Sequence, residues 1–502
     1  MAGTPNMFNR RHSFRKLIAV VAAFCALLTA MDMVWVGYRR TISVSTGTTR
    51  IMGPLAANGT VNYRRAIDRH ASLGITPANN AAIDLVRALG PSAVGQGIVG
   101  LNAMNRIGMK MLPARGNYYV TYQHCYNWIH PGDVQGRKIV HPRGTLGRHP
   151  FSATAHPVTA AWLKANAIPL HFARLAAAKG RFFIPLPRRS LGWYALPNAP
   201  LPYLAKVNEI QEALLQQGML ALHGGDDGLC SRDLLAAHRL AGLVGQGPLL
   251  WQGIVGRNMD LRASQADWTF LRSKQITAAA AGAYGAAVAS LPSMRPLARD
   301  VDHFSRWAQL DYVQWQAEDW WGRSVGVHEA GFPIRVSALL PPNYTVRMMR
   351  INRWYDRFTK VFQQKGAGAR RKELNGVELR LNTPPSGTRM SRQRLYLSLM
   401  GANFDSLIAL SARVKSARRI TGTLLALRRY RMDHGMYPRS LGELVPNYLA
   451  HLPLDAFTGK PILLVRGRGT YSLVMAASFD SLIPAGQVPQ ADGQMVVNLA
   501  AR

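Results

Sequence analysis

Two carboxylates with a spacing suited to acid–base chemistry, Asp311 and Glu318, lie in a segment rich in tryptophan. On a helix, a separation of seven residues puts both side chains on one face, about two turns and about 10 Å apart. Paired carboxylates hydrolyse glycosidic bonds, and tryptophan rings can stack on sugars. The same segment contains Asp319 and the tryptophans at positions 307, 315, 320 and 321. One function that this pattern indicates is an envelope glycan-binding protein or hydrolase that uses residues 307–321.

A structural role explains the same residues more simply. The carboxylates can balance the charges of nearby arginines such as Arg306 and Arg323. Tryptophans on a helix more often pack in the core or between helices than bind a ligand. We favour this structural interpretation, and we assign no catalytic residue from the sequence.

Potential ligands of a transition metal gather in one loop-rich segment, which contains His124, Cys125, His130, His141, His149 and His156. Metal ligands must converge at about 2 Å in a fixed geometry, usually with carboxylates or carbonyl groups supporting them. Asp133 is the one carboxylate between these residues, and the chain lacks the HExxH, paired CxxC and HxH patterns. We therefore interpret these histidines as structural or surface residues and expect no metal site among them.

The motifs of covalent catalysis and of phosphate binding are also missing or misplaced. The Gly-x-Ser-x-Gly pattern is absent, and Ser-x-x-Lys occurs only in weak contexts such as Ser13 to Lys16. The run from Gly95 to Gly100 matches Gly-x-Gly-x-x-Gly, but it follows a predicted helix where the dinucleotide-binding turn requires a strand. An enzyme is therefore the less favoured class.

The charge of the chain is strongly positive. Its 61 Lys and Arg residues against 26 Asp and Glu residues give a formal net charge of +35. Such a charge attracts polyanions. The basic residues are scattered as singles and pairs and do not form the patch or arm that is typical of nucleic-acid binding. We therefore expect anionic envelope polymers or lipid surfaces as partners, and no nucleic acid.

Three cysteines, Cys25, Cys125 and Cys230, are too few for a disulfide framework in a chain of 502 residues. A bridge between Cys125 and Cys230 stays open as an alternative to two free thiols.

The N-terminus has the pattern of a membrane anchor. Residues 1–16 are basic and predict a cytoplasmic segment, and residues 17–38 form an apolar run with one charged residue, Asp32. Its 22 residues can cross about 30 Å of hydrocarbon. Cleavage as a signal peptide is the alternative, but Thr29 to Met31 fits a cleavage site poorly. We expect an uncleaved, single-pass anchor that contacts lipid in the inner (cytoplasmic) membrane, with the body on the periplasmic or another extracytoplasmic side.

The rest of the chain divides by composition. We expect a neck and first helices over 39–110, a loop-rich insertion over 111–157, a helical domain over 158–364, a linker over 365–390, and a long helix with a small α+β domain over 391–502.

Apolar periodicity predicts most of the helices. A helix capped at Thr76 to Asn79 is expected to run to Leu89 and to stop at Gly90 and Pro91. Apolar stripes over 204–215, 234–244 and 249–259, separated by Gly-rich turns, predict antiparallel helices in a bundle or a helical repeat. A long helix is expected from Ser391 to about Arg431, with a break or bend near Gly401 and Gly422.

The C-terminal residues carry the most specific pattern of the chain. A helix ends in Asp433-His-Gly-Met-Tyr-Pro438, and Leu452-Pro-Leu-Asp-Ala-Phe-Thr-Gly-Lys-Pro461 precedes a strand-like segment at Tyr471 to Met475. This region, residues 424–502, resembles the soluble domain of the major pseudopilin of type II secretion. The whole layout, including Asn79 to Ala82 before its helix, resembles a family of uncharacterised bacterial membrane-anchored envelope proteins. The resemblance implies a small α+β domain and secretion-system proteins as partners.

Two departures limit what the resemblance implies. The N-terminus lacks the prepilin-peptidase pattern, so assembly through a processed N-terminal helix is not supported. The calcium loop of the major pseudopilin corresponds to a region in which Asp480 and Asp492 are the available carboxylates. Calcium prefers six to eight oxygen ligands, so these two residues are weak calcium candidates and we expect no cofactor.

Together these patterns predict a mainly α protein with an N-terminal transmembrane helix, a helical-bundle or helical-repeat-like middle, and a small pseudopilin-like α+β C-terminal domain. The favoured function is a non-enzymatic, membrane-anchored envelope protein of scaffolding or secretion-associated type.

Overall fold

A computed structural model describes residues 27, 31, 41–95, 97–133, 145–187, 196, 199–318, 343–383, 392–467, 470–474 and 496–500. Within them, the chain divides into two compact units. Unit 1 comprises Met1–Ala66, Ala195–Pro197 and Arg306–Tyr355, and unit 2 comprises Ile67–Tyr194, Asn198–Ser305 and Asp356–Arg502. The candidate site lies in unit 2.

The expected fold class needs a correction at the N-terminus. Of residues 17–38, the structure describes only Leu27 and Met31, so the expected anchor lies outside the described residues. In the part of the chain that is described, no helix is both long enough and apolar enough to cross a membrane. The long helices carry charges along their length: the 23-residue α10 (Leu250–Arg272) includes Arg257, Asp260 and Asp267. For the described chain, the fold class with a transmembrane helix is therefore contradicted: this part is mainly helical, has one small sheet and contains no helix able to cross a membrane.

Helix α3 (Ala81–Leu89) illustrates how the local sequence sets an element of unit 2. Asn80 caps it, because its side chain accepts a hydrogen bond from the backbone N–H of Ala82 at 3.1 Å. The cap expected at Thr76 is wrong by one turn, since Asn79 instead accepts from the backbone N–H of Thr76. The helix ends at Gly90, whose φ of 82° suits glycine.

Short helices follow α3 in the sequence. They are η1 (Pro91–Val94), α4 (Gly97–Arg106), α5 (Tyr122–Ile129), η2 (Pro131–Asp133), α6 (Pro157–Ala165) and α7 (Ala167–Ala177). Helix α7 packs on α3 and on α9. Pro157 stands at the start of α6, where its missing N–H costs no hydrogen bond.

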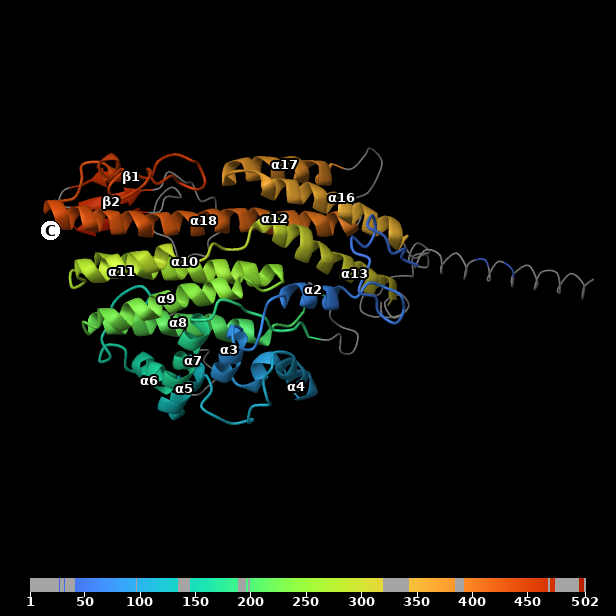
Figure 1. Cartoon of the computed structure of the whole chain (residues 1–502), viewed down its shortest axis with the longest axis horizontal. Helices are drawn as coiled ribbons and strands as arrows, with labels where there is room; N and C mark the ends of the chain where they lie inside the picture. The colour runs from blue at the N-terminus through green and yellow to red at the C-terminus, as the bar shows by residue number, and fades with distance from the viewer. Residues whose placement is uncertain are drawn as a thin grey trace, which may run out of the picture. The chain divides into compact units, whose positions relative to one another are not determined.

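An antiparallel array of helices forms the centre of unit 2. It consists of α8 (Pro202–His223), α9 (Asp227–Val244), α10 and α11 (Ala278–Ala289) (Figure 1). The apolar stripes predicted helices at α8, α9 and α10, and α11 follows these three in the sequence. The turn between α8 and α9 uses Gly225 at a φ of 84° and ends in Asp226, whose side chain caps α9 by accepting from the backbone N–H of Leu229. Buried apolar residues such as Leu214, Leu234 and Met259 fill the space between these helices.

The C-terminal part of unit 2 is built on one long helix, α18 (Arg392–His434), which lies against α10 and against α17 (Ala367–Asn382) (Figure 1). Helix α18 continues through Gly401 and Gly422 without interruption, so the expected break is wrong. Helix α17 lies within the segment that we expected to be a linker. Helix α18 packs on α10 and α17, and such tertiary packing contributes more to the stability of a helix than the propensity of its residues does.

A small sheet follows α18. After η5 (Leu441–Leu444), the strands β1 (Leu463–Arg466), β2 (Thr470–Val474) and β3 (Val496–Ala500) pair antiparallel in the order β1-β2-β3. Tyr471 lies opposite Leu499, and Leu473 lies opposite Val497. Leu473, Val497 and Leu499 are buried, so one face of the sheet belongs to the core.

Unit 1 joins segments that are distant in sequence. It contains the start of α2 (Tyr63–Ala71), helix α13 (Arg306–Glu318) and the first half of α16 (Tyr344–Gln363). Tyr63 donates its hydroxyl hydrogen bond to the backbone carbonyl of Thr49 at 2.7 Å, and Asn352 donates to the carbonyl of Thr48 at the same distance. Before α13, the chain forms α12 (Leu297–Arg299) and the π-helical η4 (Asp300–Ser305) in unit 2.

Candidate functional site

The acidic segment of α13 does not present a carboxylate pair to a common ligand. Asp311 is buried and accepts a hydrogen bond from the backbone N–H of Leu196 at 3.1 Å. Glu318 is exposed and accepts from the side-chain amide of Asn58 at 3.3 Å. Trp307 is buried, and Asp319 and the tryptophans at 320 and 321 lie outside the described residues. The observed contacts of Asp311 and Glu318 are therefore structural.

The histidine-rich segment likewise shows no converging ligands. His124 is exposed on α5 beside the buried Cys125, and the ring of His156 packs edge-on against Phe151. Within the described ranges, no group of three or more His, Cys, Asp or Glu residues is placed to hold a metal ion. His141, and the weak calcium candidates Asp480 and Asp492, lie outside the described residues.

Cys125 and Cys230 are both free and buried. The bridge that the sequence left open is not formed. Burial raises the pKa of each thiol, so both are held in the uncharged form.

A buried group of ionisable side chains lies between α9, α10 and α18. We call it the buried quartet, and it consists of His238, Asp260, Asp267 and Arg418. The Nδ1 atom of His238 is 2.7 Å from Asp260, and its Nε2 atom is 2.9 Å from Asp267. Arg418 donates two hydrogen bonds to Asp260, at 2.8 and 3.0 Å. The side chains of His238 and both aspartates are at most 1% exposed.

The geometry of α10 explains how one imidazole reaches two carboxylates. Asp260 and Asp267 are seven residues apart and face the same side, about 10 Å apart along the axis. His238 enters from α9 between them, and Arg418 enters from α18. Helices from three parts of the sequence are therefore joined by ionic hydrogen bonds.

Further polar groups complete the environment of Asp267. Tyr284 on α11 donates its hydroxyl to one carboxylate oxygen, and Thr421 on α18 donates to the other at 3.4 Å. The indole N–H of Trp268 donates to the Thr421 hydroxyl at 3.2 Å. Buried polar groups need such partners, because an unsatisfied one costs about 1–3 kcal/mol.

The charges of the quartet balance. Burial opposes the charged form of His238, but Asp267 and Asp260 outweigh it and raise the pKa of the imidazole to about 10. Burial likewise opposes ionisation of Asp260, yet His238 and Arg418 hold the pKa of that carboxyl below its usual value. At neutral pH the quartet consists of two cations and two anions, which is the arrangement that makes buried charge tolerable.

This arrangement contains the residue types of an acid–base site, but both ring nitrogens of its histidine are already hydrogen-bonded to carboxylates. A general base needs a free nitrogen within reach of a substrate proton. Both ring nitrogens of His238 are taken by carboxylates, and Cys230, the nearby nucleophile type, is buried and held as a neutral thiol. The quartet therefore connects helices, and neither ring nitrogen of His238 is left for a substrate proton.

Sequence reasoning missed the quartet, although a signal was available. Asp260, Asp267 and His238 stand at the apolar positions of their helices, among buried residues such as Ala263 and Leu234. Charged side chains on a buried face predict a partner from another element. The partner itself could not be identified, since Arg418 is 158 residues from Asp260.

A second cluster lies at the surface where α18 ends. We call it the aromatic–arginine surface, and it comprises two sets of ring contacts whose tyrosines are half-buried: Tyr430, His434 and Tyr448 with Arg429, and Tyr437 and Tyr471 with Arg431 and Arg466. The rings of Tyr430 and His434 are 4.2 Å apart, and those of Tyr437 and Tyr471 are 5.2 Å apart. Arg431 lies over Tyr437 at 4.9 Å. Tyrosine and arginine are enriched at protein–protein interfaces, because they combine large contact area with hydrogen bonding.

Two exposed methionines lie close to these residues in the sequence. Met432 is 41% exposed and Met436 is 68% exposed. Tyr430 donates a hydrogen bond to Glu443, and Tyr448 donates one to Asp433 at 2.6 Å, so the rings are held in place before any partner binds. Such preorganisation lowers the entropic cost of association.

Comparisons with protein-family models, with curated proteins and with solved structures find no match to the chain.

Proposed function

We propose that the chain is a non-enzymatic scaffold of the cell envelope that binds other proteins through its aromatic–arginine surface. The buried quartet carries the proposal. The acid–base groups best suited to chemistry are paired with one another, and they join α9, α10 and α18. The quartet residues hold these helices together, and helices held in this way can give rigid support to a binding surface.

The end of α18 supplies that surface. Helix α18 is held by the quartet through Arg418, and the same helix carries Tyr430 and His434 about three and four turns further on. The core holds this helix, so the part of the surface that lies on α18 is rigidly supported. The resemblance of this region to the major pseudopilin supports a secretion-system protein as the partner.

A photo-cross-linking experiment tests this function. A benzophenone amino acid is introduced at Met436, which is 68% exposed beside Tyr437, in the full chain in the cells that produce it. Leu73 is the matched control, because it is 69% exposed in unit 2 but lies outside the surface. We expect a discrete protein adduct at Met436 that is lost when Tyr448 is also replaced by Ala.

The proposal is wrong if Met436 gives no protein adduct, or if Leu73 gives the same adducts with equal yield. An adduct that survives Tyr448→Ala unchanged also contradicts it, because the tyrosine rings then contribute nothing to binding.

A further inference from the structure

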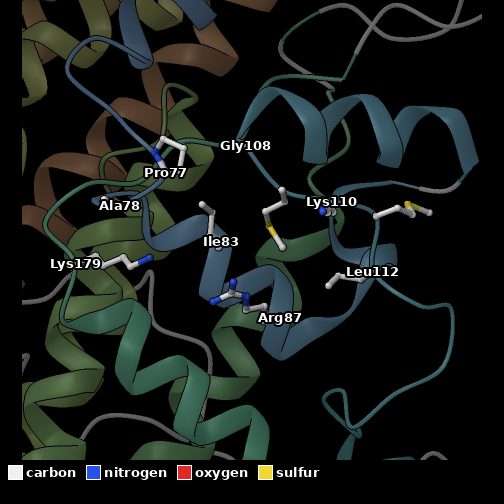
Figure 2. Close-up of a pocket in the computed structure, with 10 residues that line it drawn as sticks. Pro77, Ala78, Ile83, Arg87, Gly108, Lys110, Leu112 and Lys179 are labelled. Atoms are coloured by element: carbon white, nitrogen blue, oxygen red, sulfur yellow. The ribbon is translucent and has the colours of Figure 1, made fainter.

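A cavity of about 550 Å³ lies in unit 2, between α3 and the chain that follows α4 (Figure 2). We call it the basic pocket, because Arg87, Lys110 and Lys179 all line it. Its volume is within the range of small-molecule sites. It is separate from the quartet and from the aromatic–arginine surface, which use none of these residues.

The cations of the basic pocket exceed its counter-charges. Asp84 pairs with Arg87 at 3.0 Å and with Lys179 at 2.8 Å, and its side chain is only 4% exposed. Across the described ranges, no carboxylate pairs with Lys110. Figure 2 shows the ends of Arg87 and Lys179 below Ile83, and both of these ends pair with Asp84. An anion entering the basic pocket meets positive charge that one buried carboxylate does not neutralise.

Apolar groups form the rest of the wall. Ile83 and Met109 are buried, whereas Met111 is 50% exposed although it lines the cavity. Gly108 permits the close approach of this wall to Pro77: it has a φ of 81°, and a Cβ atom there would lie 2.6 Å from the proline ring. An exposed methionine beside a cation provides a surface for an apolar chain attached to an acidic head group.

We infer that the basic pocket binds a small amphipathic anion, a carboxylate or phosphate head group joined to an alkyl chain. The head group lies at Lys110, on the side of the pocket that Arg87 and Lys179 also make positive, and the alkyl chain lies along Met109 and Met111. Both parts contribute, because charge-assisted hydrogen bonds hold the head group and burial of the chain removes apolar surface from water. The inference does not depend on the proposed scaffold function.

Calorimetric titration of the full chain with decanoate below its micelle concentration tests this inference. Decyltrimethylammonium has the same chain with the opposite charge, and acetate has the same head group without the chain. We expect decanoate to bind and both comparison ligands to bind at least about tenfold more weakly, as the loss of an ionic contact or of an alkyl chain requires.

Three variants locate the binding. Lys110→Gln should weaken decanoate binding about three- to fivefold, as expected for one partly solvated ion pair. Met111→Ser should weaken it about fivefold through lost apolar contact. Lys164→Gln removes an exposed positive charge on α6 away from the pocket and should leave the affinity unchanged.

Vesicles of phosphatidylglycerol distinguish a lipid source from a free acid. Vesicle binding that decanoate competes for and that Lys110→Gln weakens assigns the pocket to lipid head groups, whereas decanoate binding without vesicle binding assigns it to free amphipathic acids; either outcome supports the ligand class. Equal binding of decanoate and decyltrimethylammonium overturns it. So does a Lys110→Gln affinity that matches that of Lys164→Gln.

Discussion

Two carboxylate pairs with the same seven-residue spacing have different roles in the two units. In unit 2, Asp260 and Asp267 on α10 are joined by a single imidazole, that of His238. In unit 1, Asp311 on α13 binds the backbone N–H of Leu196, and Glu318 binds side chains at the surface. The spacing fixes which face of the helix the acids share, but their role depends on what the neighbouring elements supply.

Ion pairing with buried cations characterises the pair in unit 2. Asp260 and Asp267 are fully buried, so their ionised forms require cations, and His238 and Arg418 provide them. Asp311 is also buried, and it accepts a hydrogen bond from the backbone N–H of Leu196. In the quartet one carboxylate serves two cations, so loss of that carboxylate is expected to be costly. The following predictions compare this loss with substitutions on α13.

The largest expected effect follows the substitution Asp260→Ala. It leaves His238 and Arg418 without their shared anion in a buried site, so we expect a loss of about 3–5 kcal/mol in the free energy of unfolding. Denaturant titration measures it. Glu373→Ala, an exposed carboxylate on α17, is the control and should change stability by less than about 0.5 kcal/mol. Equal effects of the two substitutions would contradict the ionic role of the quartet.

The pH dependence of stability is expected to be next in size. The pKa of His238 rises from 6.5 to about 10 in the folded state, so its contribution is fully present below about pH 6.5 and is lost as the pH rises through about 10. We expect the denaturation midpoint of the wild type to fall between pH 7 and about pH 9.5 more steeply than that of His238→Gln. His223→Gln, at an exposed position of α8, should keep the wild-type slope. Identical slopes in the wild type and His238→Gln would show that the histidine is not bound as an imidazolium.

A smaller loss is expected from Asp311→Ala. The substitution leaves the backbone N–H of Leu196 without this acceptor in a buried position, at a cost of about 1–3 kcal/mol. Thermal denaturation of the full chain followed by tryptophan fluorescence measures the change, since Trp307 lies on the same helix. A loss as large as that of Asp260→Ala would remove the distinction between the two carboxylate pairs.

Glu318→Gln is expected to have the smallest effect. Glu318 is exposed and binds polar side chains at the surface, and such contacts contribute less than about 1 kcal/mol. Its denaturation midpoint should match the wild type within error. A destabilisation comparable to that of Asp311→Ala would show that the surface contacts of α13 are stronger than their exposure indicates.

Local sequence patterns predicted many of the elements. The apolar stripes of α8, α9 and α10 have helical period, and Gly225 marks the turn between the first two. The strand-like residues at Tyr471 belong to β2. These features depend on neighbours in sequence, which is why a single chain reveals them.

Those local patterns could not predict contacts between elements that are distant in the sequence. Helix α18 runs through Gly401 and Gly422, where propensity alone favoured a break, and as a whole it packs against α10 and α17. His238 and Arg418 are selected as partners of Asp260 by packing between segments 22 and 158 residues away. The histidines that attracted attention by their density, such as His124, lie apart from the buried ionic site.

Hydrogen–deuterium exchange of the full-length Asp260→Asn variant tests most directly whether the quartet joins the helices. Peptides from α9, α10 and α18 should lose protection together, because His238 and Arg418 both lose the carboxylate that they share, and peptides from α13 should exchange as in the wild type. Loss of protection confined to α10, or wild-type exchange in α9 and α18, would contradict the account.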